Sequence, residues 1–157
     1  MLYLCTNKEA AMSEVRPWIG SMISLGLFVT TRDMALVDCR RHSDEGQTIF
    51  LEVPPVEEWA GIVWSEIGRA FTKPVTRSDE TGDYVATQIL AELFRAEGFD
   101  GIAYGSAFGE RSTNLALFDL DSAELEQCQL HEATQIKMNF RERDNPYWVR
   151  KISQRSR

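Results

Sequence analysis

Residue types that build common metal and catalytic sites are scarce in this 157-residue chain. It has three cysteines, Cys5, Cys39 and Cys128, which lie far apart and in no metal-ligand spacing. We interpret them as buried free thiols of a reducing cytoplasm rather than as a disulfide framework. The two histidines, His42 and His131, add little to a zinc site, so we expect no bound metal.

Long apolar runs and signature motifs are also missing. No stretch is long and apolar enough to span a membrane, and the N-terminus lacks the layout of a signal peptide. No phosphate-binding loop, dinucleotide glycine fingerprint, nucleophile elbow or zinc-binding helix motif is present. Basic residues are in deficit, and the net charge of −7 argues against direct nucleic-acid binding. We therefore expect a cytoplasmic protein that binds neither a membrane nor nucleic acid.

The rest of the composition is typical of one globular domain. Apolar residues make up 43% and charged residues 26% of the chain, and the length suffices for a buried core. We expect this domain to span residues 1–142. The tail, residues 143–157, is rich in arginine and lysine. It either packs its aromatic side chains on the domain or docks on a partner.

The stretch from Asp83 to Phe118 gives the clearest secondary-structure pattern of the chain, a helix followed by two strands. Apolar residues recur at helical spacing from Val85 to Phe94, with Asp83 as a start signal and Gly98 as a stop signal. Two short strands are expected to follow, at 101–106 and 113–118. Ser106 therefore ends a strand, a position that can present a hydroxyl group to a cleft.

The N-terminal segment holds the second candidate residue. Leu2 to Cys5 reads as a strand that begins without a lead-in, so we expect that an upstream segment is missing. A capping box, Thr6-x-x-Glu9, then predicts a helix through about Val15. Glu14 lies near the end of this helix, where the helix dipole disfavours a carboxylate. It is either a solvated surface acid or an acid held there for chemistry.

The remaining elements follow from β-branched runs and from proline positions. The two prolines before Val56 open a helix, in which Trp59 and Trp64 are expected in the core rather than against a ligand. Strands and helices interleave without regular alternation, which predicts an α+β fold with a split, mainly antiparallel β-sheet and helices on its outside. The further expected elements are a pair of strands at Ser21–Thr30 and Met34–Cys39, a short strand at Ile49–Val53, the helix from Pro55, and a last strand at Cys128–Phe140.

The order and spacing of several short motifs resemble the RES domain family over nearly the whole chain. The motifs are Tyr3-Leu4, Ala10-Ala11-x-x-Glu14-Val15-Arg16-Pro17, Leu36-x-Asp38, Tyr84-x-x-Thr87-Gln88, Ala91-Glu92, Gly98-Phe99-Asp100-Gly101-Ile102-x-Tyr104-x-Ser106, and Asn114-x-x-Leu117-Phe118.

This resemblance implies both a fold and an activity. RES proteins are toxins of bacterial toxin–antitoxin pairs, similar in fold to ADP-ribosyltransferase toxins, and they destroy NAD. By position, the resemblance implies catalytic roles for Glu14, Ser106 and Tyr3, with Asn114 joining them in binding NAD. The family arginine should lie upstream of Tyr3, where this chain has no residue. Arg16 is a poor substitute because it follows the glutamate.

Three functions stay open at this stage. The first is an NAD-degrading enzyme that cleaves the nicotinamide–ribose bond and passes ADP-ribose to phosphate or water. The second is a transferase that modifies a protein, and the third is a catalytically weak module that binds an antitoxin or a nucleotide. NAD is expected as a substrate, a cognate antitoxin as the partner, and a homo-oligomer is left open. A carboxylate suits the first two functions, because loss of nicotinamide builds positive charge on the ribose.

Overall fold

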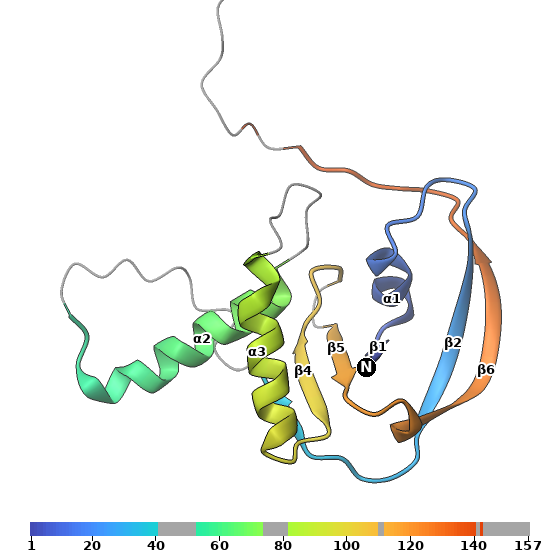
Figure 1. The fold of residues 1–157 in the computed structure, drawn as a ribbon. Helices are drawn as coiled ribbons and strands as arrows, with labels where there is room; N and C mark the ends of the chain where they lie inside the picture. Colours follow the sequence, from blue (N-terminus) through green and yellow to red (C-terminus); the bar gives the residue numbers. More distant parts are fainter. Residues whose placement is uncertain (41–52, 74–81, 110–111, 141, 143–157) are drawn as a thin grey trace, which may run out of the picture.

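The computed structural model describes residues 1–40, 53–73, 82–109, 112–140 and 142. Within them, helices and strands interleave along the chain in the mixed order that the sequence predicts (Figure 1). The elements are β1 (Leu2–Cys5), α1 (Lys8–Glu14), β2 (Met22–Thr30), β3 (Leu36–Asp38), the 3-10 turn η1 (Val56–Glu58), α2 (Trp59–Thr72), α3 (Gly82–Ala96), β4 (Gly101–Gly105), β5 (Thr113–Leu117), the 3-10 turn η2 (Leu120–Ser122) and β6 (Ala123–Glu132).

The described strands form two sheets. One sheet has four strands in the order β1-β5-β4-β3, and the other pairs β2 with β6. Pairing is antiparallel between β1 and β5, β4 and β5, and β2 and β6, while β3 and β4 are parallel. The four-stranded sheet lies between the helices α2 and α3 and the β2–β6 pair (Figure 1). The predicted α+β fold with a mainly antiparallel, split sheet is therefore confirmed.

The two strands expected on either side of residues 31–33 both form, but they lie in different sheets. β2 runs for nine residues and finds its full-length partner in β6, while the three residues of β3 pair with β4. The short connection between β2 and β3 thus crosses between sheets instead of closing a hairpin. Because β2 takes its register from a segment about a hundred residues away, no local signal at residues 31–33 reveals the crossing.

The expected last strand is displaced. β6 begins at Ala123 and ends at Glu132, whereas the sequence predicts a strand from Cys128 to Phe140. Pairing with β2 sets these limits, since Thr30 lies opposite Ala123 and Met22 lies opposite Glu132. The part of the expected strand at residues 49–52 and the basic tail, 143–157, lie outside the described residues.

Helix starts differ from the sequence signals by one or two residues. Asn7, not Thr6, caps α1, and its side-chain oxygen accepts a hydrogen bond of 2.9 Å from the amide of Ala10. Thr6 instead extends the sheet, because its hydroxyl accepts from the amide of Thr113 at 3.1 Å. The third helix begins at Gly82, so Asp83 lies inside its first turn. Gly98 ends that helix as predicted, with a left-handed φ of +86°.

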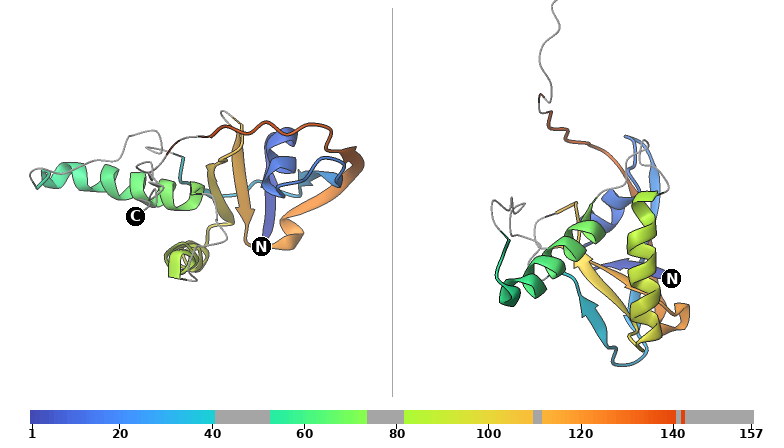
Figure 2. Two further views of the ribbon diagram at one scale, coloured as in Figure 1. Left: turned by 90° about the horizontal axis from the view of Figure 1, so that it is seen from above. Right: turned by 60° about the vertical axis from the view of Figure 1, so that its left-hand side comes forward.

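The core lies where α2 and α3 meet strands β3 and β4. Its buried members include Val37, Phe94 and Ile102, and Phe71 and Tyr104 pack against them. The rings of Trp64 and Phe94 stack with their centroids 6.3 Å apart. The far end of α2 runs outward from this core, as the view from above shows (Figure 2). Among the described helices, none combines the length and apolar character needed to cross a membrane.

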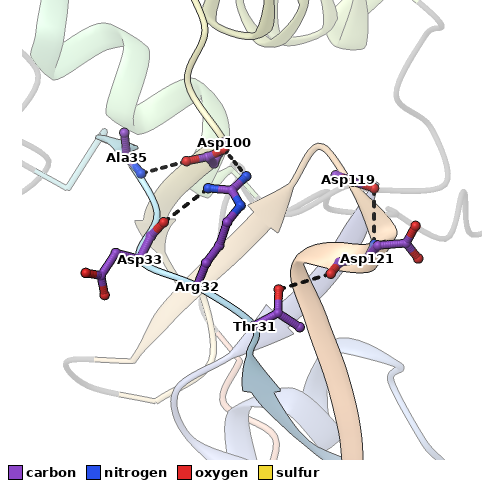
Figure 3. Close-up of polar contacts among 7 residues, drawn as sticks. All are labelled: Thr31, Arg32, Asp33, Ala35, Asp100, Asp119 and Asp121. Carbon is purple, nitrogen blue, oxygen red and sulfur yellow. Dashed lines mark hydrogen bonds and ion pairs between the residues drawn. The ribbon is translucent and has the colours of Figure 1, made fainter.

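A polar clasp joins the β2–β3 connection to the start of β4 (Figure 3). The guanidinium of Arg32 donates to Asp100 at 2.5 Å, and the amide of Ala35 donates to the other carboxylate oxygen at 2.8 Å. This pairing holds the pKa of Asp100 below its usual value, chiefly through the hydrogen bond from Arg32. The clasp therefore ties the point where the chain crosses between sheets to the sheet that carries the site described next.

Candidate functional site

The seven-residue helix α1 carries Glu14 to one end of the four-stranded sheet. The helix starts directly after β1, where Thr6 donates to the carbonyl of Thr113 at 2.9 Å and so extends the β1–β5 ladder by one residue. Its last residue is Glu14, which lies beside the residues that end β4 and begin β5.

Glu14 is held by two side chains from that end of the sheet. The hydroxyl of Ser106 donates to Glu14 Oε1 at 2.9 Å, and the amide nitrogen of Asn114 donates to the same oxygen at 2.7 Å. Ser106 is itself fixed, since its oxygen accepts from the amide of Phe108 at 3.1 Å. The structure thus brings three of the four residues named from the sequence into one hydrogen-bonded group, although about a hundred residues of chain separate Glu14 from Asn114.

A cavity of about 270 Å³ opens on this group. Glu14 and Asn114 line it, and aromatic side chains from three segments form much of the rest of its wall. Asn114 is buried, with 7% of its surface exposed, and its carbonyl oxygen accepts no hydrogen bond from the described residues. The remaining lining residues are Arg16, Phe71, Thr72, Lys73, Tyr104, Gly105, Ala107 and Phe108.

Tyr3, the fourth residue named from the sequence, lies apart from this cavity lining. It shares a sheet face with Asn114, because Cys5 pairs with Asn114 and Tyr3 is two residues away on the same strand. Its side chain is 67% exposed, and its hydroxyl donates to the sulfur of Met1 at 3.6 Å. In this conformation Tyr3 lies on the same face of the sheet as the site but does not line the cavity.

Tyr104 is an aromatic residue of the cavity lining that lies directly opposite Asn114. It pairs with Asn114 across β4 and β5, and its ring lies 6.0 Å from that of Phe71. Burial is the largest of the causes that together raise the pKa of Tyr104 to about 12, and the nearby carboxylate of Glu14 acts in the same direction. Tyr104 is therefore a neutral phenol at physiological pH, able to donate a hydrogen bond beside the carboxylate.

Two cations of the cavity lining, Arg16 and Lys73, are not among the site residues expected from the sequence. Arg16 follows Glu14 by two residues and adopts a left-handed φ of +48°, which turns the chain at the end of α1. Lys73 follows the last residue of α2 and lines the same cavity. The sequence offers one signal for both, because each residue directly precedes a proline, which favours the end of a helix. Arg16 is a poor substitute for the family arginine by its position after Glu14 in the sequence, but that position does not determine where the residue lies in the fold.

The fold and the site together define a class of protein. The protein is an α+β domain in which a hydroxyl group and an amide hold a carboxylate on the wall of a small, partly aromatic cavity. Such an arrangement is suited to binding a polar small molecule. A family model described as the RES domain matches residues 1–140, and the chain belongs to this family. Membership supports an NAD-related, toxin-like module at the level of the family. Comparisons with curated proteins and with solved structures gave no match.

Proposed function

We propose that this site cleaves the nicotinamide–ribose bond of NAD and passes ADP-ribose to phosphate or water. The observation that carries the proposal is Glu14, a carboxylate held by Ser106 and Asn114 at a cavity of about 270 Å³. Such a volume suits one nucleoside-sized group, and a charged, oriented acid is what the bond cleavage requires. Family membership provides independent support.

The reaction moves one pair of electrons at each step. The bond between ribose C1′ and the nicotinamide nitrogen breaks, its electrons go to nicotinamide, and the ring leaves uncharged. Positive charge then develops on the ribose, and the Glu14 carboxylate stabilises it. An oxygen of phosphate or water bonds to C1′, and when water is the nucleophile its proton passes to the surrounding solvent. Ser106 and Asn114 both donate to Glu14 Oε1, so we assign Oε2 as the oxygen that receives a ribose hydroxyl.

Neighbouring groups orient the substrate and the acid. Ser106 and Asn114 limit rotation of the Glu14 carboxylate, so little reorganisation is needed as charge develops. The buried carbonyl oxygen of Asn114, which has no described donor, suits a ribose hydroxyl or the nicotinamide amide. Phe71, Tyr104 and Phe108 offer ring faces and edges for the nicotinamide ring.

A cognate antitoxin is the partner we propose for this toxin-like domain in the cytoplasm. Two helices expose apolar side chains at helical spacing, Trp59 and Val63 on α2, and Val85, Ile89 and Leu93 on α3. An exposed apolar row of this kind is typical of surfaces that bind another protein. The check is copurification of the chain with the protein encoded beside it, and recovery of each protein alone would count against the pair.

Product analysis tests the proposed reaction. The purified chain is incubated with NAD in phosphate and in phosphate-free buffer, and nicotinamide and ADP-ribose products are separated by liquid chromatography. We expect nicotinamide to appear mole for mole with NAD lost, accompanied by phosphorylated ADP-ribose in phosphate and by free ADP-ribose without it. Products in which nicotinamide stays attached to ribose would contradict the proposal. ADP-ribose recovered on protein would instead assign the chain to the protein-modifying transferases.

A further inference from the structure

A second cavity shares one lining residue with the cavity of the candidate site. It has a volume of about 450 Å³ and is lined by the α1–β2 connection and the start of β2, including Trp18, Ser21 and Ile23. Arg16 lines both cavities and is the residue that their linings share. A ligand that occupied both cavities would therefore pass Arg16.

We propose that the second cavity is the adenosine subsite of the NAD site, with Trp18 stacking on the adenine base and Arg16 binding the pyrophosphate. This inference rests on the proposed function for the identity of the ligand. The first cavity, at about 270 Å³, holds one nucleoside and not both halves of a dinucleotide. The other half needs a second space joined to the first through a cation, which is the arrangement that Arg16 creates.

Arg16 has the chemistry that a pyrophosphate requires. A guanidinium presents several donors in one plane and binds phosphate oxygens in pairs. The chain carries a net charge of −7, so a dianionic linker depends on local cations for its binding. Lys73 lines the first cavity and adds a second positive charge on that side of the junction.

Trp18 is held in a position that suits stacking. The residue Trp18 is 72% exposed, and its backbone forms a hydrogen-bonded turn. The Trp18 amide donates to the hydroxyl of Ser21 at 3.1 Å, and the Ser21 amide donates back to the Trp18 carbonyl at 3.0 Å. The turn is tied to the end of β6, because Gly20 donates to the carbonyl of Ala133 at 2.7 Å. An ordered backbone that presents a largely exposed indole provides a ready platform for a base.

Binding measurements with two ligands test the assignment. ADP-ribose contains the adenosine half, whereas nicotinamide mononucleotide lacks it. We expect Trp18→Ala to weaken ADP-ribose binding about tenfold, the loss typical of a removed base–aromatic stack, and to leave nicotinamide mononucleotide binding unchanged. Trp18→Phe keeps a ring and should retain most of the affinity. Trp59→Ala, which removes an exposed indole of α2, is the matched control and should change neither.

The outcomes separate this inference from the proposed reaction. Equal loss of affinity for both ligands in Trp18→Ala, or ADP-ribose binding at the wild-type level, would overturn the adenosine subsite even if NAD is cleaved. ADP-ribose binding that depends on Trp18, in a chain that releases no nicotinamide, would uphold the subsite and reject the reaction. Should Trp18→Ala fail to fold, Trp18→Phe compared with Trp18→Leu decides, since leucine keeps an apolar side chain without a ring.

Discussion

The backbone of Arg16 adopts an unusual conformation that the neighbouring residues in the sequence do not predict. Its φ of +48° is left-handed, a conformation that costs a residue other than glycine roughly 1–3 kcal/mol. That turn follows the end of α1, and Arg16 lines both cavities. Such a cost persists where the surrounding contacts determine the conformation, and sites that bind ligands are where it accumulates.

Replacing Arg16 separates this backbone effect from the charge. Glycine adopts a left-handed φ freely, whereas a β-branched residue does so at high cost. We expect the free energy of unfolding of Arg16→Gly to stay within about 1 kcal/mol of the wild-type value. The free energy of unfolding of Arg16→Val should fall by more than that. Both variants should bind ADP-ribose at least about tenfold more weakly, because both lose a charge-assisted hydrogen bond.

Urea denaturation gives the free energies of unfolding, and calorimetry gives the affinities. Equal stability of the glycine and valine variants would show that the left-handed turn at residue 16 does not cost what its φ implies. Unchanged ADP-ribose binding in both variants would remove Arg16 from the binding site.

The elements differ in how far the sequence predicts them. Most starts and stops follow local signals, such as Gly98 after α3 or the prolines before α2. Strand partners do not, because β2 and β6 meet across about a hundred residues and only their long-range pairing sets the limits of β6. The clasp of Arg32 and Asp100 is invisible in the sequence for the same reason, since the two residues are 68 positions apart.

Acid should weaken the clasp in a predictable direction. The pKa of Asp100 is lowered in the folded chain, so the unfolded chain takes up the proton first as the pH falls. The stabilisation is therefore complete at neutral pH and is lost below about pH 4, the ordinary value for an aspartate. We expect Asp100→Asn to have a lower free energy of unfolding than the wild type at pH 7. This difference in free energy should shrink as the pH falls below about 4.

Asp33→Asn is the matched control for this measurement. Asp33 lies in the same connection, but its backbone carbonyl, and not its carboxylate, accepts from Arg32. Thermal unfolding of the three proteins between pH 3 and pH 7 is the comparison. A stability difference between Asp100→Asn and the wild type that stays constant over this range would mean that the carboxylate charge does not stabilise the clasp.

For the whole molecule, the sequence predicts the fold class more completely than the site. Interleaved helices and strands indicate an α+β fold, and the structure confirms it. Of the residues named for chemistry, Glu14, Ser106 and Asn114 form one hydrogen-bonded group. Glu14 and Asn114 line the cavity, whereas Ser106 and Tyr3 lie outside its lining. The cavity walls contributed by α2 were not predictable, because they depend on how that helix packs on β4 and not on a local motif. Roles in catalysis remain a prediction for all four residues.

The central claim is that the Glu14 carboxylate stabilises the ribosyl cation, and Glu14→Gln tests it most directly. The amide keeps the shape of the side chain and an acceptor for Ser106 and Asn114, but it carries no charge. The measurement is the rate of nicotinamide release from NAD, with ADP-ribose affinity determined on the same samples. Glu9→Gln, an exposed acid of the same helix, serves as the control.

We predict that Glu14→Gln loses roughly 10²–10³-fold in turnover, the scale of a removed electrostatic contact to developing charge. Its affinity for ADP-ribose should stay within a few-fold of the wild type, because the charge matters chiefly in the transition state. Glu9→Gln should retain both properties. Full turnover by Glu14→Gln would contradict the account, since the carboxylate would then have no part in stabilising the ribose.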